Sequence, residues 1–193
     1  MGGPRVFAVA WHVDYWNYLD WVDEFSDPAY TARQERFAAV LGSGVYTPEV
    51  VVNLFEVDYA DATSLGGMTE VLDYFLEVEV ATSVTVWLGS APDANPLVVN
   101  YMTDGAPAGS ELTVILVEGG LTNDVTSGEN TGETLDHENV ARSVTTVTES
   151  LEGGQVELVP PGDLIVENAR IIAFVQDATT LEYFGATGIR LVE

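Results

Sequence analysis

The sequence contains no cysteine. Disulfide bonds, thiol catalysis and cysteine-bound metals are therefore excluded within these 193 residues. It contains only two histidines, His12 and His137, so a zinc site would need Asp or Glu as its remaining ligands. On this basis we predict no catalytic residue, no metal and no cofactor.

Lysine is absent as well, and the chain has six arginines but 31 acidic residues, which gives a net charge of −25. Such a surface repels phosphate backbones and anionic lipids, so nucleic acid and acidic membranes are not expected as partners. The acidity is typical of a strongly hydrated, halophilic surface, on which concentrated salt screens the self-repulsion. A role in binding cations is the alternative interpretation.

Long hydrophobic runs are also missing. None approaches the roughly 18 residues that a membrane span needs. The first eleven residues have neither a long apolar stretch nor a small-residue cleavage site, so they predict no signal peptide. Hydrophobic residues nevertheless make up 47% of the chain, which favours a folded core over disorder.

The first 81 residues alternate between strand and helix patterns. Phe7–His12 is a nearly continuous apolar run, as in a strand covered on both faces, and 49–55 is rich in β-branched residues. Asp27 and Pro28 predict the start of a helix and Gly42 its end. Two helices are predicted from apolar residues at helical spacing: Tyr30, Phe37, Val40 and Leu41 in the first, and Met68, Val71, Leu72, Phe75 and Leu76 in the second.

From residue 82 the pattern changes to short β-rich runs separated by clusters of Gly, Pro, Asn and Asp. The runs span 84–89, 97–102, 111–118, 140–148, 155–159, 170–176 and 181–186. Strands at this spacing predict an antiparallel β-sandwich of the immunoglobulin-like kind. The predicted fold class is therefore α/β plus all-β, with one domain over residues 1–81 and a second over 82–193.

Several blocks of the sequence carry a family likeness. They are HVDYWNYLDWVDEFSDPAYTARQERFAAVLG (12–42), VYTPEVVVN (45–53), GENTGETLDHENVARSV (128–144) and ARIIAFVQDATTLEYFGA (169–186). With these blocks the chain resembles the exported, thioredoxin-like proteins grouped as domain of unknown function 1223. Those proteins carry His-Val-Asp-Tyr-Trp and, later, Tyr-Thr-Pro before a strand.

The resemblance implies export and a thioredoxin-like sheet over residues 1–81. In that sheet Phe7–His12 is the second strand and 49–55 the third, and Pro48 takes the place of the proline that is cis in thioredoxin folds. The family's first strand and its Cys-x-x-Cys helix are absent from this sequence. That strand would lie between the other two, whose backbone groups need partners. We expect further sequence upstream, closure of the remaining strands on each other, or a strand supplied by another chain.

The first group of candidate site residues follows the predicted first strand. Alternation puts His12 and Asp14 on one side of the strand, which predicts a hydrogen-bonded pair. One interpretation is that the pair caps the strand end while Trp16 packs over the core. Another is that the pair joins Tyr15 and Trp16 in a surface that binds a ligand or partner. A catalytic dyad is a third, although the pattern offers no nucleophile for it to activate.

The second group lies on the predicted helix and the loop after it. Thr47 and Pro48 form either a plain strand-entry turn or a loop that holds an extended peptide, as the corresponding loop does in redox members of the fold. Arg33 and Gln34 stand in the first turns of the helix. Arg33 is expected to pair with one of the acids in 20–27, with an anion site as the alternative.

The acid-rich segment 124–138 does not match the spacing of an EF-hand calcium loop. We therefore expect a loop of solvated acids there, with His137 at the start of a strand.

Together these features predict a redox-inactive, exported module that binds an extended peptide or protein. A thiol-disulfide oxidoreductase whose cysteines lie upstream is the alternative. A third hypothesis is a structural subunit that accepts a strand from a partner, or forms oligomers, through the unfilled centre of its sheet.

Overall fold

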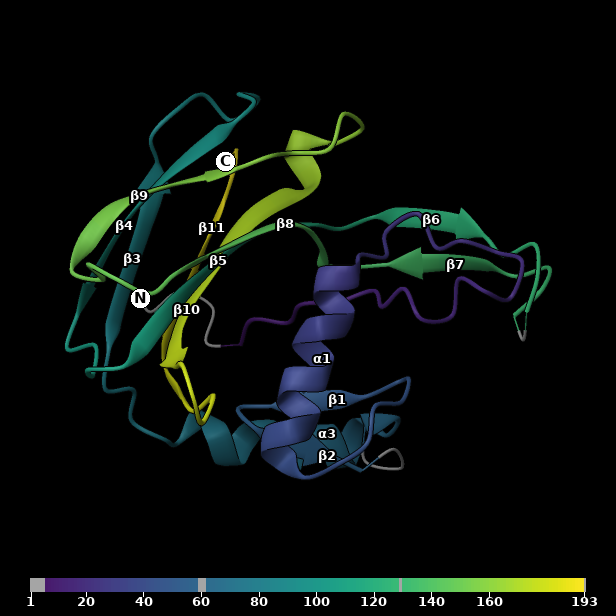
Figure 1. Cartoon of the computed structure of the whole chain (residues 1–193), viewed down its shortest axis with the longest axis horizontal. Helices are drawn as coiled ribbons and strands as arrows, with labels where there is room; N and C mark the ends of the chain where they lie inside the picture. The colour runs from purple at the N-terminus through teal and green to yellow at the C-terminus, as the bar shows by residue number, and fades with distance from the viewer. Residues whose placement is uncertain (1–5, 59–61, 129, 193) are drawn as a thin grey trace.

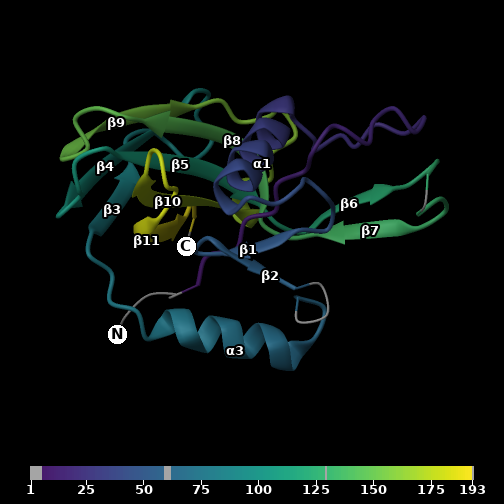
Figure 2. The ribbon, with the colours of Figure 1, turned by 60° about the horizontal axis from the view of Figure 1, so that its bottom comes forward.

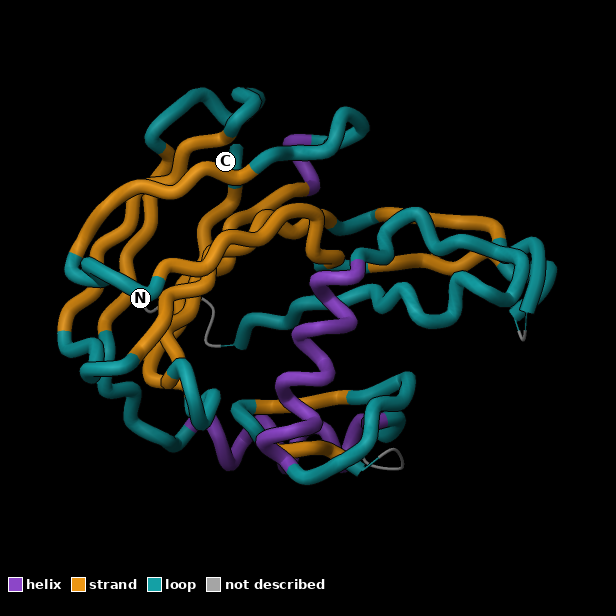
Figure 3. The backbone as a smooth tube through the Cα atoms, in the orientation of Figure 1, coloured by secondary structure: helices purple, strands orange, loops and turns teal. Residues whose placement is uncertain are grey.

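The computed structural model describes residues 6–58, 62–128 and 130–192. Most of the regular structure in the described residues is antiparallel β-strand, and the helices α1 and α3 lie within the first 80 residues (Figures 1 and 3). The mixed class of helices and strands followed by strands alone is confirmed at this level.

Two antiparallel sheets form a β-sandwich from residues 83–190. One sheet has the order β11 (Tyr183–Arg190), β10 (Ala169–Asp177), β5 (Ser110–Glu118) and β8 (Val140–Val147). The other has the order β3 (Ser83–Leu88), β4 (Leu97–Asp104) and β9 (Gly153–Leu158). Each of the seven β-rich runs of the sequence overlaps one of these strands. A short 3-10 helix, η1 (Val166–Asn168), precedes β10.

The two sheets also meet along both of their edges. The Thr82 backbone N–H donates to the Phe184 carbonyl at 3.0 Å, where β3 approaches β11. The Thr145 hydroxyl donates to the Glu157 carbonyl at 2.9 Å, where β8 approaches β9. Gly185 is required at the first seam, since a Cβ at this position would lie 2.1 Å from the Thr82 carbonyl oxygen.

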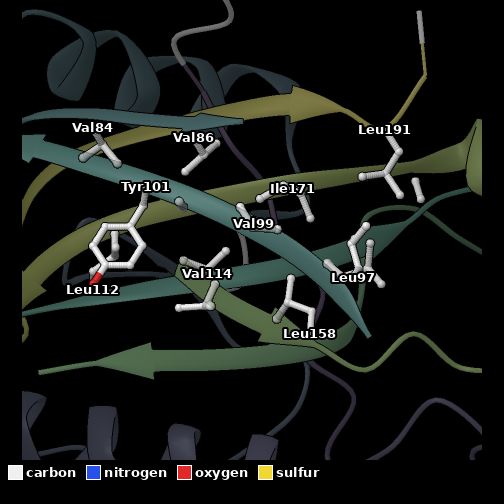
Figure 4. Close-up of a cluster of buried hydrophobic side chains, with 14 of the residues drawn as sticks. Val84, Val86, Leu97, Val99, Tyr101, Leu112, Val114, Leu158, Ile171 and Leu191 are labelled. Carbon is white, nitrogen blue, oxygen red and sulfur yellow. The ribbon is translucent and has the colours of Figure 1, made fainter. Parts of the chain in front are cut away.

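The main hydrophobic core lies between the sheets (Figure 4). Side chains alternate inward along β4, where Leu97 and Val99 are fully buried, and Leu112, Val114 and Leu158 meet them from β5 and β9. This alternation is the period of two that a strand with one buried face requires.

The central strands β5 and β10 are buried on both faces. Their second face carries Ile115, Val117, Ile172 and Phe174, and these side chains pack against Tyr30 of the first helix and against Phe7, Val9 and Trp11. Residues from both sides of position 81 therefore share one core. The division into domains at that position stays a prediction.

Helix α1 (Pro28–Leu41) begins and ends as the sequence predicts. The Asp27 side chain accepts a hydrogen bond from the Ala29 N–H at 2.7 Å, and Gly42 closes the helix at φ 71°. Tyr30 and Phe37 are buried against the sandwich, whereas Val40, which belongs to the same apolar pattern, is 42% exposed.

The prediction of a strand at Phe7–His12 is wrong. This segment pairs with the sheet at one point only, a parallel bridge between Ala10 and Val140. Ala10 donates to the Asn139 carbonyl at 2.9 Å and accepts from the Ala141 N–H at 2.9 Å. The apolar side chains cover the outer face of the sandwich sheet, so the apolar run reflects burial by packing rather than a place inside a sheet.

The strand predicted over 49–55 is a hairpin of β1 (Val50–Val52) and β2 (Phe55–Val57). Asn53 and Leu54 form its turn at φ 47° and 69°, the left-handed pair of a two-residue hairpin loop. Helix α3 (Leu65–Leu76) follows, with its predicted apolar face only half-buried. Figure 2 shows the hairpin between α1 and α3.

The acidic segment is also more ordered than expected. β6 (Leu121–Asp124) and β7 (Thr134–His137) form a hairpin that extends away from the sandwich (Figure 1). Asp124 and residues 134–137 belong to the strands of this hairpin, whereas the described residues between them form its loop. A loop over the whole of 124–138 is therefore wrong, and His137 ends a strand instead of starting one.

Candidate functional site

Five of the eight predicted site residues meet on one surface. The Trp16 indole N–H donates to the Thr47 hydroxyl at 2.9 Å, and the Tyr15 hydroxyl donates to Gln34 Oε1 at 3.1 Å. The peptide bond between Thr47 and Pro48 is cis, as the family resemblance implies. We call the surface formed by these five residues, together with Tyr18, Tyr46 and Glu49, the Trp16 surface.

Gln34 organises this surface from helix α1. Its amide nitrogen donates to the Tyr46 carbonyl at 2.7 Å and to Glu49 Oε2 at 2.6 Å, while its oxygen accepts from Tyr15. One side chain thus joins the N-terminal segment, the helix and the loop before β1. The other carboxylate oxygen of Glu49, Oε1, is buried and has no hydrogen-bond partner among the described residues.

Aromatic rings dominate the exposed part of the Trp16 surface. Trp16 is 44% exposed, Tyr18 72% and Tyr46 37%, so the expectation that Trp16 packs over the core is wrong. The ring centroid of Trp16 lies 5.3 Å from that of Tyr15 and 6.3 Å from that of Tyr18. Exposed aromatic groups of this kind are typical of protein-interaction sites.

Nearby carboxylates make the environment of these rings strongly negative. The Tyr46 hydroxyl donates to Glu56 Oε1 at 2.7 Å, and this hydrogen bond raises the pKa of Tyr46 to about 12. Burial raises the pKa of Tyr15, with a further contribution from the charge of Glu49. Both phenols therefore stay neutral hydrogen-bond donors at physiological pH.

The strand that follows this surface has one unpaired edge. β1 pairs with β2 only, and in the described part of the chain no other strand joins this sheet. In a two-residue hairpin the pair next to the turn, Val52 with Phe55, is hydrogen bonded. Alternation then turns the backbone N–H and C=O of Val51 outward, away from β2.

His12 does not pair with Asp14, so that prediction is wrong. His12 Nδ1 lies 2.6 Å from Asp23 Oδ2, and the His12 ring meets the His137 ring edge-on at 4.9 Å. Phe25 packs against both imidazoles. Since the segment Phe7–His12 is not a strand, its alternation does not hold at His12, and the loop after it brings Asp23 back to the imidazole.

This histidine pair joins the N-terminal segment to the β6–β7 hairpin. His137 Nε2 lies 2.9 Å from Asn123 Oδ1 on the neighbouring strand. Burial and the charge of His12 lower the pKa of His137. Burial disfavours ionisation of Asp23, but the hydrogen bonds from His12 and from the Phe25 N–H outweigh it and lower the Asp23 pKa. Neither imidazole contacts a serine or threonine hydroxyl among the described side chains, so the cluster is not arranged as a nucleophile with its base.

Asp14 and Arg33 take other partners than those expected. The Asp14 N–H donates to the Thr31 hydroxyl, and that hydroxyl donates back to Asp14 Oδ1 at 2.5 Å, which joins the N-terminal turn to α1. Arg33 pairs with none of the acids of 20–27 and instead donates to the Tyr183 hydroxyl at 3.1 Å. Its guanidinium lies over the rings of three aromatic residues, namely Trp11 and Phe37 at 4.7 Å and Phe174 at 5.3 Å.

Sequence reasoning missed Glu49, Tyr46, Asp23 and the pairing of His12 with His137. The two histidines lie 125 positions apart, and no local pattern announces such a contact. Glu49 adjoins the Thr47–Pro48 motif and could have been included for its position alone. In the part of the chain that the structure describes, no three His, Asp or Glu side chains are grouped as metal ligands. No described helix is both long and apolar enough to cross a membrane.

Comparisons with known proteins identify a family and a similar fold. The model of a family described as "Protein of unknown function (DUF1223)" matches residues 1–176. A protein from Agrobacterium tumefaciens, solved by X-ray crystallography, has a similar structure with a TM-score of 0.68 at 22% identity. The match covers 96% of this chain and 80% of that one. At this identity the likeness shows the fold alone.

A second solved structure is more distant. It is a domain of the outer membrane lipoprotein Omp28 from Porphyromonas gingivalis, with a TM-score of 0.35 at 17% identity over 56% of this chain and 94% of that one. A likeness at this level carries no argument about the present chain. A search of curated proteins gives no match.

Proposed function

The chain belongs to the DUF1223 family of proteins of unknown function, and we propose that it is a non-catalytic module that binds an extended peptide or protein segment. The observation that carries the proposal is the unpaired edge of β1 directly after the Trp16 surface. Backbone groups along this edge would add the peptide as a further strand, and the exposed rings would contact its side chains.

The order of the elements supports this use of the edge. The loop Tyr46–Pro48 leads into β1, and the hydrogen bonds from Trp16 and Gln34 hold it in place before the strand begins. A loop already held on both sides loses little conformational entropy when a peptide binds. The peptide would run from the aromatic rings along the outward-facing backbone groups of Val51.

Finer assignments of fold and location belong to the same proposal. From the family resemblance we propose an incomplete thioredoxin-like segment over residues 1–81, and from the spacing of the strands an immunoglobulin-like sandwich over residues 82–193. Export to the periplasm or the exterior is proposed from the family resemblance alone. Within these 193 residues no cysteine can react with the peptide, so the module would bind it without redox chemistry.

Amide exchange tests the edge directly. The probe is the acetylated, amidated peptide Thr-Val-Thr-Val-Thr-Val-Thr, and we expect it to slow exchange at the Val51 N–H. In Val51→Pro the outward donor is lost while the β1–β2 bonds remain, so affinity should fall by more than about tenfold. Val51→Ala keeps the N–H and is the matched control. Equal binding by Val51→Pro and Val51→Ala would place the peptide elsewhere.

A thiol-disulfide oxidoreductase with its cysteines upstream is the second candidate, and the position of Pro48 shortly before β1 favours it. Reading the DNA before Met1 tests this function. An in-frame strand followed by Cys-x-x-Cys would support it, and a stop codon close upstream would refute it.

The third candidate, a subunit that accepts a strand from another chain, uses the same edge of β1. Size-exclusion chromatography with light scattering is the test. A stable dimer that Val51→Pro dissociates would favour it over peptide binding, and a monomer at all concentrations would refute self-assembly.

A further inference from the structure

We propose that the bound segment is basic and presents an arginine or lysine side chain to the rings of Trp16 and Tyr46, facing the carboxylates of Glu49 and Glu56. This inference rests on the proposed function, because it names the chemistry of the peptide that the β1 edge would hold. The site would therefore select peptides by charge as well as by their extended shape.

Uncompensated negative charge is the first support. Glu49 accepts a hydrogen bond from the neutral amide of Gln34, and Glu56 accepts one from the neutral phenol of Tyr46. No described arginine forms an ion pair with either carboxylate. An incoming cation would therefore meet no competing positive charge from the described arginines at these two carboxylates.

Glu49 adds a specific cost that a cation would relieve. Its Oε1 atom is buried and accepts no hydrogen bond from the described residues. In a carboxylate this atom is as strong a hydrogen-bond acceptor as Oε2. A buried acceptor without a donor destabilises the protein. A cation placed beside the carboxylate would offset part of this destabilisation. The free energy of binding would then be more favourable, because the free protein carries the destabilisation and the complex does not.

The aromatic rings supply the second half of a cation site. Tyr15, Trp16 and Tyr18 lie in a row with centroid separations of 5.3 and 6.3 Å, and Trp16 is 44% exposed. The face of an indole is a strong cation–π partner for a guanidinium or ammonium group. Arg33 shows the same chemistry inside this protein, since its guanidinium lies 4.7 Å from the centroid of Trp11.

The charge of the whole chain favours the same partner. A net charge of −25 attracts cationic segments from a distance and repels acidic ones. The chain's own arginines are not available to fill the site from α1, because Arg33 donates to Tyr183 and Arg36 is paired with Glu111. The two arginines of α1 therefore leave the site open to a cation from a partner.

Isothermal titration calorimetry with three probes tests the inference. The probes are acetylated, amidated Thr-Val-Thr-X-Thr-Val-Thr peptides in which X is arginine, citrulline or glutamate. Arginine should bind about tenfold tighter than its neutral analogue citrulline, and glutamate should bind most weakly. In about 1 M KCl, where the Debye length falls to about 3 Å, the preference should shrink.

Variants locate the effect. Glu49→Gln should remove most of the preference for arginine, whereas Glu157→Gln on the outer face of β9 should leave it unchanged. Trp16→Ala provides a second test, with the equally exposed Trp87→Ala on β3 as its control. Circular dichroism confirms that each variant is folded.

The outcomes separate this inference from the proposed function. Equal affinity for arginine and citrulline, with Val51 still protected from exchange, refutes the basic partner and leaves the edge site intact. A preference for arginine that Glu49→Gln and Trp16→Ala both leave unchanged also refutes it. Failure of all three peptides to bind refutes both.

Discussion

The pair of histidines that joins the N-terminal segment to the β6–β7 hairpin makes stability depend on pH. Protonating both imidazoles places two positive charges about as far apart as the ring centroids, which are separated by 4.9 Å. At an effective dielectric constant between about 80 and 20, that repulsion is about 1–3 kcal/mol. Asp23 faces His12, and the more distant carboxylates Glu24 and Asp136 offset part of the repulsion at His137.

The sign follows from the lowered pKa of His137. A folded-state pKa below the unfolded value means that the unfolded chain binds more protons. The contribution of His137 is therefore fully present above its ordinary pKa of about 6.5 and is lost as the pH falls through the folded value. The lowered pKa of Asp23 acts in a separate window, below its ordinary value of about 3.8.

Urea unfolding at pH 8 and about 5 measures the effect. The free energy of unfolding of the wild type should fall by up to about 2 kcal/mol more than that of His137→Gln over this interval, because one group with an ordinary pKa of about 6.5 can contribute no more between pH 8 and 5. The comparison matters because acidification also neutralises part of the −25 charge and would by itself stabilise every variant. His12 and His137 are the chain's only histidines, so the double variant His12→Gln/His137→Gln gives the baseline without imidazoles. The same pH dependence in wild type and His137→Gln would refute the reasoning.

Three further perturbations have expected results. Arg142→Met should cost about 3–5 kcal/mol in urea unfolding, because it leaves the fully buried Glu118 carboxylate, now 3.0 Å from the guanidinium, without its charge partner; adding Glu118→Gln should recover part of the loss. Leu116→Ala should cost about 2–5 kcal/mol at a position with no exposure, whereas Leu65→Ala at 88% exposure should change stability by less than about 0.5 kcal/mol. Raising KCl from about 0.1 M to about 1 M should raise the melting temperature by screening the acidic surface, and an unchanged midpoint would contradict the halophilic interpretation.

The sequence predicted the positions of helices and strands correctly where they depend on caps, turns and alternation among neighbouring residues. Asp27, Pro28 and Gly42 mark the ends of α1 because capping depends on a few neighbouring residues. The seven β-rich runs after residue 82 overlap the seven strands of the sandwich, since turn residues and alternation act over the same short range.

The N-terminal apolar run was wrongly predicted to be a strand, because a run of apolar residues indicates burial and not strand pairing. Phe7–His12 is apolar since it covers Ile172 and Phe174 on the sandwich sheet, not because its backbone lies inside a sheet. A run of buried residues has no intrinsic pairing partner, so only the neighbouring surface decides whether it becomes a strand.

Some residues of the candidate site could be predicted from local motifs, and others could not. Tyr15, Trp16, Gln34, Thr47 and Pro48 were recognisable as motif residues, and the fold brings them together through side-chain hydrogen bonds. The partner of His12 could not be read from the chain. Asp14 and Asp23 are both within reach by sequence separation, and the turn at 14–19 decides between them.

The sequence by itself determined that no thiol reaction occurs in these residues and that the surface is strongly negative. It also determined the β-rich C-terminal part and the positions of caps and turns. Tertiary structure alone decided which groups meet across long separations: His12 with His137, Arg33 with its aromatic rings, and Glu49 with Gln34. The physical reason is range. Propensities, caps and turns act between near neighbours, whereas the contacts of a site depend on the packing of elements whose relative placement no local pattern encodes.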